Sequence, residues 1–203
     1  SNSAEGVIDG RLRLGVAQHP FTIHEGKELC GLRINATIEN PGSTPAGIRK
    51  GGAGRLCLAA SNSFTGQITI DDGSIHAAHN YALGAPAGGT IVNSGATLGF
   101  TGVPDNVFEP ITLNGPGASD GGALRTSGAL AIHSGLVLGS HSIILVHDGQ
   151  LDLNGLVSGP GGFTKMGLGT LRLHGRGNNT YAVDTVAEQG EVVLAQAEGN
   201  ASP

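Results

Sequence analysis

Acidic side chains are the first candidates for chemistry in this sequence, because two carboxylates at a suitable separation can cleave glycosidic bonds as acid, base or nucleophile. The adjacent pair is Asp71 and Asp72, directly before Gly73. Further acids are scattered along the chain, at Asp105, Glu109, Asp120 and Asp148. An Asp-Asp-Gly sequence is typical of a turn, and no hydrolase triad or nucleophile elbow stands out. We therefore expect a turn role for the pair and predict no catalytic residue.

The histidines are the second candidates, because imidazole binds metals and titrates near neutral pH. The chain has eight of them. His76 and His79 are three residues apart, a spacing that does not place both rings on one face of a strand. His133, His141 and His147 fall on three successive short segments, where a ladder with weak metal affinity is conceivable. We expect exposed turn histidines and predict no metal site and no cofactor.

Two short glycine-rich segments resemble phosphate-binding loops: Gly52-Ala53-Gly54 and Gly167-Leu168-Gly169. No helical pattern and no Gly-Lys-Ser or Gly-Lys-Thr sequence follows either one, so a nucleotide site is not expected. The 11 basic residues are scattered singly and the formal net charge is -5, which argues against nucleic-acid binding. The longest apolar runs are too short to insert into a membrane.

The composition favours a chain of strands and turns. Among 203 residues there are 36 glycines and 9 prolines, only 13% are charged, and tryptophan is absent. With 38% apolar residues the chain is too hydrophobic for a disordered segment. Its core must be filled mainly by small aliphatic side chains. Because the chain starts and stops without terminal signals, we interpret it as a segment of a longer protein.

Two copies of one long unit organise the chain. Residues 47–58 align with residues 162–173 without a gap, and Asn62-Ser63-Phe64-Thr65 then matches Asn179-Thr180-Tyr181-Ala182 after a short insertion. The copies extend over approximately residues 26–100 and 148–200. Fixed internal repetition is typical of solenoids, in which each unit is buried against its neighbours.

Within each unit, apolar and polar residues alternate over three to five positions and are separated by Gly, Asn and Asp, as in Gln67-Ile68-Thr69-Ile70. Such alternation predicts short strands joined by turns. We predict an all-β fold, a right-handed parallel β-helix formed by residues 1–203 as a single unit. Five glycines beside the strands are expected to turn the chain with positive φ, at Gly73, Gly95, Gly128, Gly149 and Gly190.

The repeated motif resembles a known family. Lys50-Gly51-Gly52-Ala53-Gly54-Arg55-Leu56-Cys57-Leu58, followed by Asn62-Ser63-Phe64-Thr65-Gly66, is similar to the autotransporter-associated β-strand repeat, and residues 163–173 with Asn179-Thr180-Tyr181 resemble it too. The second copy departs from the family pattern at Ala182, where Thr-Gly is absent. The resemblance implies a passenger segment of an autotransporter, secreted or exposed at a Gram-negative cell surface. It brings no catalytic residues.

Alternation within the repeat predicts which side chains point into the coil. The residues expected inside are Leu29, Leu56, Leu58, Leu151, Leu171 and Leu173. Those expected outside are Cys30, Cys57, Asp152 and Arg172.

Matching positions on adjacent turns would bring two pairs of outer side chains together. We predict a disulfide between Cys30 and Cys57, which suits an exported protein. Asp152 and Arg172 would form an exposed ion pair of little energetic value.

These observations predict a non-enzymatic stalk or display scaffold that contributes to adhesion, with a host or cell-surface ligand as partner. End-to-end self-association is expected, because a coil of parallel strands has unpaired edges at its ends. The alternative is an accessory module that binds or processes carbohydrate, which a carboxylate cluster on one flat face would favour. Only Tyr81 and Tyr181 are available as tyrosines to stack on a sugar ring.

Overall fold

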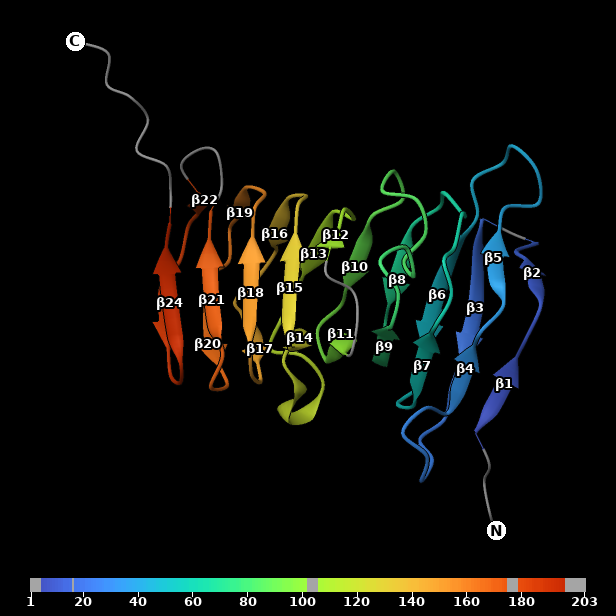
Figure 1. Cartoon of the computed structure of the whole chain (residues 1–203), viewed down its shortest axis with the longest axis horizontal. Helices are drawn as coiled ribbons and strands as arrows, with labels where there is room; N and C mark the ends of the chain where they lie inside the picture. Colours follow the sequence, from blue (N-terminus) through green and yellow to red (C-terminus); the bar gives the residue numbers. More distant parts are fainter. Residues whose placement is uncertain (1–4, 16, 102–105, 175–178, 196–203) are drawn as a thin grey trace.

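The computed structural model describes residues 5–15, 17–101, 106–174 and 179–195. In this part of the chain nearly all regular structure is short β-strand, and the one helical element is the 3₁₀ turn η1 (Ser119–Gly121). Figure 1 shows the strands stacked side by side along the long axis, with β1 and β24 at opposite ends. Among the described residues, no helix is long and apolar enough to cross a membrane. The all-β fold predicted from alternation is confirmed.

The strands form three faces that the chain visits in a fixed order, and neighbouring strands on each face are parallel. Face 1 holds nine strands: β1 (Gly6–Ile8), β4 (Leu32–Ile34), β7 (Arg55–Leu58), β9 (Gly73–Ala77), β11 (Ala96–Thr101), β14 (Leu124–Ser127), β17 (Ser142–Val146), β20 (Phe163–Met166) and β23 (Thr185–Ala187). Face 2 holds two groups: β2 (Arg11–Arg13) with β5 (Thr37–Glu39), and then β12 (Asn106–Val107), β15 (Ala129–Ile132), β18 (Gln150–Leu153), β21 (Thr170–Leu173) and β24 (Glu191–Leu194). Face 3 holds β3 (Gln18–Thr22), β6 (Gly47–Gly51), β8 (Ile68–Ile70), β10 (Thr90–Val92), β13 (Ile111–Leu113), β16 (Leu136–Leu138), β19 (Val157–Gly159) and β22 (Thr180–Tyr181). The chain is therefore a parallel β-solenoid of about eight turns.

Side chains at alternate strand positions form ladders inside the coil. On face 1 one ladder runs in register through Leu56, Ile75, Leu98, Leu124 and Ile144, and all five side chains are fully buried. Burial of one aliphatic side chain of this size is worth about 1.5–3 kcal/mol, so each member of the ladder adds to the cohesion between turns.

The inward positions predicted for the two matching strands are confirmed, because Leu56, Leu58, Leu171 and Leu173 are all fully buried. The five glycines predicted to turn the chain also have positive φ, at Gly73, Gly95, Gly128, Gly149 and Gly190.

Face 2 is interrupted in the middle of the coil. In the described residues no strand occupies it between β5 and β12. The buried side chain of Asn62 bridges this interval: the Ile38 amide donates to its Oδ1 over 2.8 Å, and its Nδ2 donates to the Ala82 carbonyl over 2.6 Å. Phe64, two residues further along, is fully buried. The Asn62 side chain, together with the backbone hydrogen bonds from Ser63 to Ile38 and from Asn62 to Tyr81, thus links three successive turns where face 2 has no strand.

The two repeat copies begin on different faces. In the first copy the motif runs from β6 on face 3 to β7 on face 1, and in the second it runs from β20 on face 1 to β21 on face 2. The second copy is therefore advanced by one face of the coil. The motif specifies a local order of strand, turn and strand, and each of the three faces can accept it.

Candidate functional site

Two lysines of the repeat lie inside the coil. Lys50 on β6 and Lys165 on β20 occupy matching positions of the two copies, and both side chains are fully buried. Their positions belong to inward ladders, since Lys50 pairs with Ile70 and Lys165 pairs with Ile144. Each ammonium group must therefore find its hydrogen-bond partners within the protein.

The Lys50 ammonium group binds backbone carbonyl groups at a corner of the coil. Its Nζ donates to the carbonyl oxygens of Gly51 at 3.1 Å, Gly52 at 2.6 Å and Asp72 at 2.9 Å. Gly51 and Gly52 belong to the same turn as the lysine, and Asp72 belongs to the next. The side chain therefore ties two successive turns together from the inside.

Lys165 repeats this arrangement in the second copy. Its Nζ donates to the carbonyl oxygens of Gly167 at 2.6 Å and Gln189 at 3.0 Å. As with Lys50, one acceptor lies two residues further along and the other immediately precedes a glycine of the next turn. We call this shared contact of Lys50 or Lys165 with carbonyl groups of two turns the lysine clamp.

The lysine clamp offsets a cost of burial. Burial lowers the pKa of Lys50 to about 8, although the nearby Asp72 carboxylate acts in the opposite direction. Burial also lowers the pKa of Lys165. Hydrogen bonds that involve a charged group typically contribute about 1.5–3 kcal/mol each, and the converging carbonyl groups supply them.

A glycine follows the second acceptor in both copies. Gly73 has φ of 63° and Gly190 has φ of 68°, a region that side chains rarely tolerate. A Cβ atom at Gly190 would also lie 2.6 Å from Lys165 Nζ. The corner therefore needs glycine both for its backbone and for access of the ammonium group to the carbonyl oxygens.

The sequence patterns predicted these glycines but not the role of the lysines. A signal was present, because the chain has three lysines and two of them stand at matching positions of the repeat. A charged residue in phase with an inward ladder indicates a buried ammonium group. The third, Lys27, is exposed.

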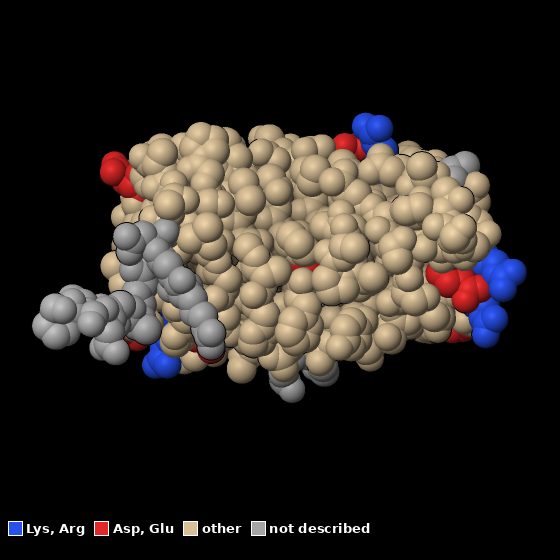
Figure 2. All heavy atoms as spheres, turned by 90° about the horizontal axis from the view of Figure 1, so that it is seen from above, with Lys and Arg blue, Asp and Glu red and all other residues tan. Residues whose placement is uncertain are grey.

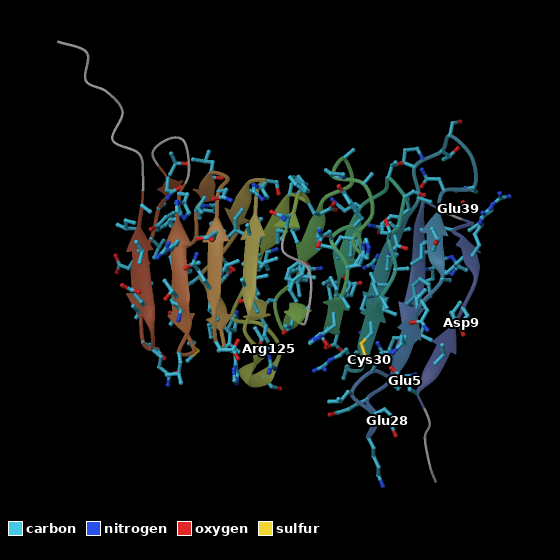
Figure 3. The ribbon with its side chains drawn as sticks, viewed as in Figure 1. Glu5, Asp9, Glu28, Cys30, Glu39 and Arg125 are labelled. Atoms are coloured by element: carbon cyan, nitrogen blue, oxygen red, sulfur yellow. A yellow bond between two sulfur atoms is a disulfide. The ribbon has the colours of Figure 1, made fainter. Side chains whose placement is uncertain are left out.

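Cys30 and Cys57 are joined by a disulfide, with Cα atoms 5.9 Å apart (Figure 3). The register differs from the expected one: Cys57 pairs laterally with Arg33, and Cys30 lies before β4. Leu29, predicted to point inward, is instead 81% exposed. The strand alternation starts only at Leu32, after a corner loop, so the phase inferred from the repeat was wrong there. The disulfide fastens this loop, residues 24–31, to β7.

In the second copy the expected register is correct but the expected ion pair is not. Leu151 is buried, and Asp152 lies beside Arg172 on the neighbouring turn. The Asp152 carboxylate instead accepts a hydrogen bond from Gln150 Nε2 at 2.8 Å and contacts His174 Nε2 at 3.0 Å. Arg172 Nε is buried without a hydrogen-bond partner. His174 lies one residue beyond β21 and contacts the Asp152 carboxylate in place of Arg172.

The adjacent acids Asp71 and Asp72 are engaged in the turn. The Asp71 carboxylate accepts from Arg49 Nε at 2.5 Å and from Asn93 Nδ2 at 3.0 Å. Asp72 Oδ1 accepts the amide of Gly73 at 2.7 Å. Both carboxylates therefore hold the corner.

The other acids are dispersed. Asp148 accepts from Ser127 Oγ and the Gly128 amide, and these hydrogen bonds hold the pKa of its carboxyl below its usual range. Asp105 and the side chain of Asp120 lie outside the described part of the structure.

The three histidines considered for a ladder bind different partners. His133 Nε2 lies 2.7 Å from Asn106 Oδ1, and His141 Nε2 lies 2.9 Å from Thr164 Oγ1. His147 contacts Asp148. Among the described residues, no three His, Cys, Asp or Glu side chains are grouped so that they could hold a metal ion.

Glu109 is a buried acid whose state the sequence did not indicate. Its side chain is 4% exposed, and its Oε1 lies 3.5 Å from Thr90 Oγ1. Burial raises the pKa of Glu109 to about 8, although hydrogen bonds from Thr90 and Gly89 act against this shift. The carboxyl group is thus mainly protonated at neutral pH.

The outer side of face 1 contains a hollow of about 320 Å³. Arg55 on β7, His76 on β9 and Arg125 on β14 line it, together with Ser119 of η1. It lies along the same edge as the disulfide, and Figure 3 shows Cys30 and Arg125 on that side of the molecule. The sequence did not predict this grouping, because its residues come from separate turns.

Replacement of Lys165 by methionine is expected to lower the free energy of unfolding by about 2 kcal/mol, because two corner carbonyl groups lose a charged donor. Lys50→Met is expected to act in the same direction. The exposed Lys27→Met is the matched control, with an effect within about 0.5 kcal/mol. Urea unfolding followed by circular dichroism measures all three. Equal losses in the three variants would contradict the lysine clamp.

Glu109→Gln is expected to change how stability depends on pH. An unfolded glutamate titrates near pH 4.3, whereas folded Glu109 keeps its proton up to about pH 8. Below both pKa values the carboxyl is neutral in both states and costs nothing. As pH rises from 4 to 7 it is mainly the unfolded state that loses the proton, so the free energy of unfolding falls, by an amount on the order of 3 kcal/mol.

Urea titrations of the wild type and Glu109→Gln at several pH values between 4 and 8 test this. In Glu109→Gln the free energy of unfolding is expected to fall less as pH rises, because the glutamine does not titrate. Parallel pH profiles for the two proteins would show that Glu109 titrates normally.

Comparison with known proteins agrees with the geometry of the repeat. Residues 48–76 and 163–194 match the model of the passenger-associated-transport-repeat family. The adhesin BmaC autotransporter of Brucella suis biovar 1 (strain 1330) is 28% identical over 151 residues, which cover 74% of this chain and 4% of that adhesin. The chain thus spans a small part of the length of this relative, and no solved structure matches it significantly. Residues 48–76 and 163–194, which carry the two lysine clamps, are therefore identified as passenger-associated-transport repeats.

Proposed function

We propose that this chain is a non-enzymatic segment of an autotransporter passenger, exposed on or released from a Gram-negative cell, where it acts as a stiff stalk that displays other parts of the passenger. The observation that carries the proposal is the continuity of the coil. Face 1 runs through nine hydrogen-bonded strands, from β1 to β23, without a missing turn. A solenoid of this kind resists bending because every turn is paired with both neighbours.

Several contacts support stiffness along the axis. The inward aliphatic ladders join successive turns, and the clamps of Lys50 and Lys165 add charged hydrogen bonds at two corners. The Cys30–Cys57 disulfide connects β7 to the loop before β4. The amide of Asn62 bridges the interval in which face 2 has no strand. Each contact links one turn to the next, as a stalk requires.

The disposition of the acids favours a scaffold over a carbohydrate-processing module. The carboxylates of Asp71, Asp72 and Asp148 accept hydrogen bonds that shape corners, and Glu109 is buried. Figure 2 shows that charged side chains on one face lie mainly at its ends and margins. These acids do not form the flat, acid-lined surface that a glycosidase-like site needs.

The relative's name supplies the link to adhesion. The similar segment belongs to a protein named as an adhesin autotransporter. We propose that this chain contributes to adhesion by holding a contact region away from the cell.

Surface exposure can be tested in the full-length protein in its own cells. An epitope tag inserted between Ser43 and Thr44 lies in an exposed loop outside the strands, so the coil should remain intact. Antibody should label intact cells, and external protease should remove the label while a periplasmic marker protein survives. Labelling only after the cells are permeabilised would contradict a surface stalk.

We also propose that the strand edges at the two ends pair with further turns or with a second copy of the chain. β1 and β23 each have one neighbour on face 1, and Val186 on β23 is exposed. Sedimentation velocity of the isolated chain should show association that increases with concentration and weakens in Val186→Lys. Val137→Lys, an exposed position in the middle of face 3, is the matched control. A monomer at all concentrations would contradict the proposal.

A further inference from the structure

We propose that the hollow on the outer side of face 1 binds a small oxyanion, that is, a carboxylate, sulfate or phosphate group on a ligand no larger than a sugar. The proposal goes beyond the stalk function and does not depend on it. It rests on how four strands and one loop bring two arginines and a histidine to the same hollow.

The strand register places these side chains on the outer surface. Leu56 and Leu58 point inward, so Arg55 and Cys57 point outward. His76 pairs laterally with Cys57 and then with Gly99, which in turn pairs with Arg125. Arg55 and Arg125 are thus separated by two intervening strands, each about 4.8 Å from the next. Both arginines nevertheless line the same hollow.

Gly99 makes room in the floor. A Cβ atom at this position would lie 2.6 Å from Nε2 of His76. The absence of a side chain at Gly99 therefore lets the imidazole of His76 lie across the neighbouring strand. His76 is largely buried but still lines the hollow.

One wall is a loop fixed in place by a threonine of the floor. Thr97 Oγ1 donates to the carbonyl of Gly122 at 2.8 Å and accepts from the amide of Ala118 at 3.1 Å. Between these two contacts, Ser119 has φ of 40°, the one positive value of a non-glycine residue in the described part of the chain. Such a conformation is unfavourable for serine. The residue in this conformation, Ser119, is one of those that line the hollow.

The charges of the described side chains that line the hollow favour an anion. Among the ion pairs of the described side chains, none includes Arg55 or Arg125. Burial and the proximity of Arg125 lower the pKa of Arg55, and burial and both guanidinium groups lower the pKa of His76 to about 4. Arg55 and Arg125 are both half-buried, and their positive charges repel each other across the hollow. A bound oxyanion would remove this repulsion and could accept paired hydrogen bonds from either guanidinium group.

The size and lining of the hollow limit the ligand. A volume of about 320 Å³ is at the lower end of small-molecule sites. Ser74, Thr97 and Ser119 are among the residues that line it, and no Phe or Tyr is among its described lining residues, so the hollow suits a compact polar ligand. A second hollow of about 200 Å³ adjoins it beyond Arg55 and is lined by Glu25 and Glu28. These acids oppose extension of an anionic ligand in that direction.

The probes are sodium glucuronate, sodium phosphate and, as the neutral control, glucose, each titrated at constant ionic strength into the whole chain with labelled histidine rings. The resonance of His76 should shift with saturable binding for an oxyanion and remain unchanged with glucose. Stronger binding of glucuronate than of phosphate assigns the site to acidic sugars, and the reverse order assigns it to phosphate groups. Either order supports an oxyanion site.

Variants identify the binding groups. Arg55→Gln and Arg125→Gln should each weaken binding by about tenfold or more, and Arg125→Lys should weaken it less. Arg49→Gln is the matched control, because it removes the same charge from face 3, where Arg49 pairs with Asp71. Thermal unfolding verifies that each variant is folded. Shifts that do not saturate, an equal response to glucose, or equal weakening by Arg49→Gln would overturn the proposal.

Discussion

Parallel pairing between successive turns is the constraint on which this structure depends. After each circuit the chain must return to within about 4.8 Å of its previous path, with the same side chains facing inward. The circuits differ in length, since Leu56 pairs with Ile75 but Gly6 pairs with Leu32. The strands keep their register while loops at the corners absorb the difference. The apolar ladder of face 1 remains continuous for this reason.

Successive turns therefore differ mainly in the length and contacts of their corner loops. Lys50 and Lys165 bind carbonyl groups of two turns at equivalent corners. Their copies of the motif lie on different faces, so the contact is a property of the motif and not of one face. An interior ammonium group costs free energy unless its donors are satisfied. This requirement selects the corner geometry in which glycines leave the carbonyl oxygens accessible.

Much of the architecture could be predicted from the sequence, because alternation and repetition are local patterns. The inward positions of Leu171 and Leu173 follow from period two alone. The phase at Leu29 could not be predicted, because a corner loop shifts where the strand begins. The lysine clamp was missed because a charged residue was not expected in an inward ladder. The hollow between Arg55 and Arg125 depends on the lengths of several circuits, which no local pattern gives.

We infer that the repeat lysines hold neighbouring turns together from inside the coil. Amine-reactive labelling of the native protein, with each lysine followed by peptide mass analysis, tests it most directly. We predict rapid modification of the exposed Lys27 and modification of Lys50 and Lys165 at least about tenfold slower. This difference should disappear in urea, because protection requires the folded state. Native Lys50 and Lys165 that react as fast as Lys27 would contradict it.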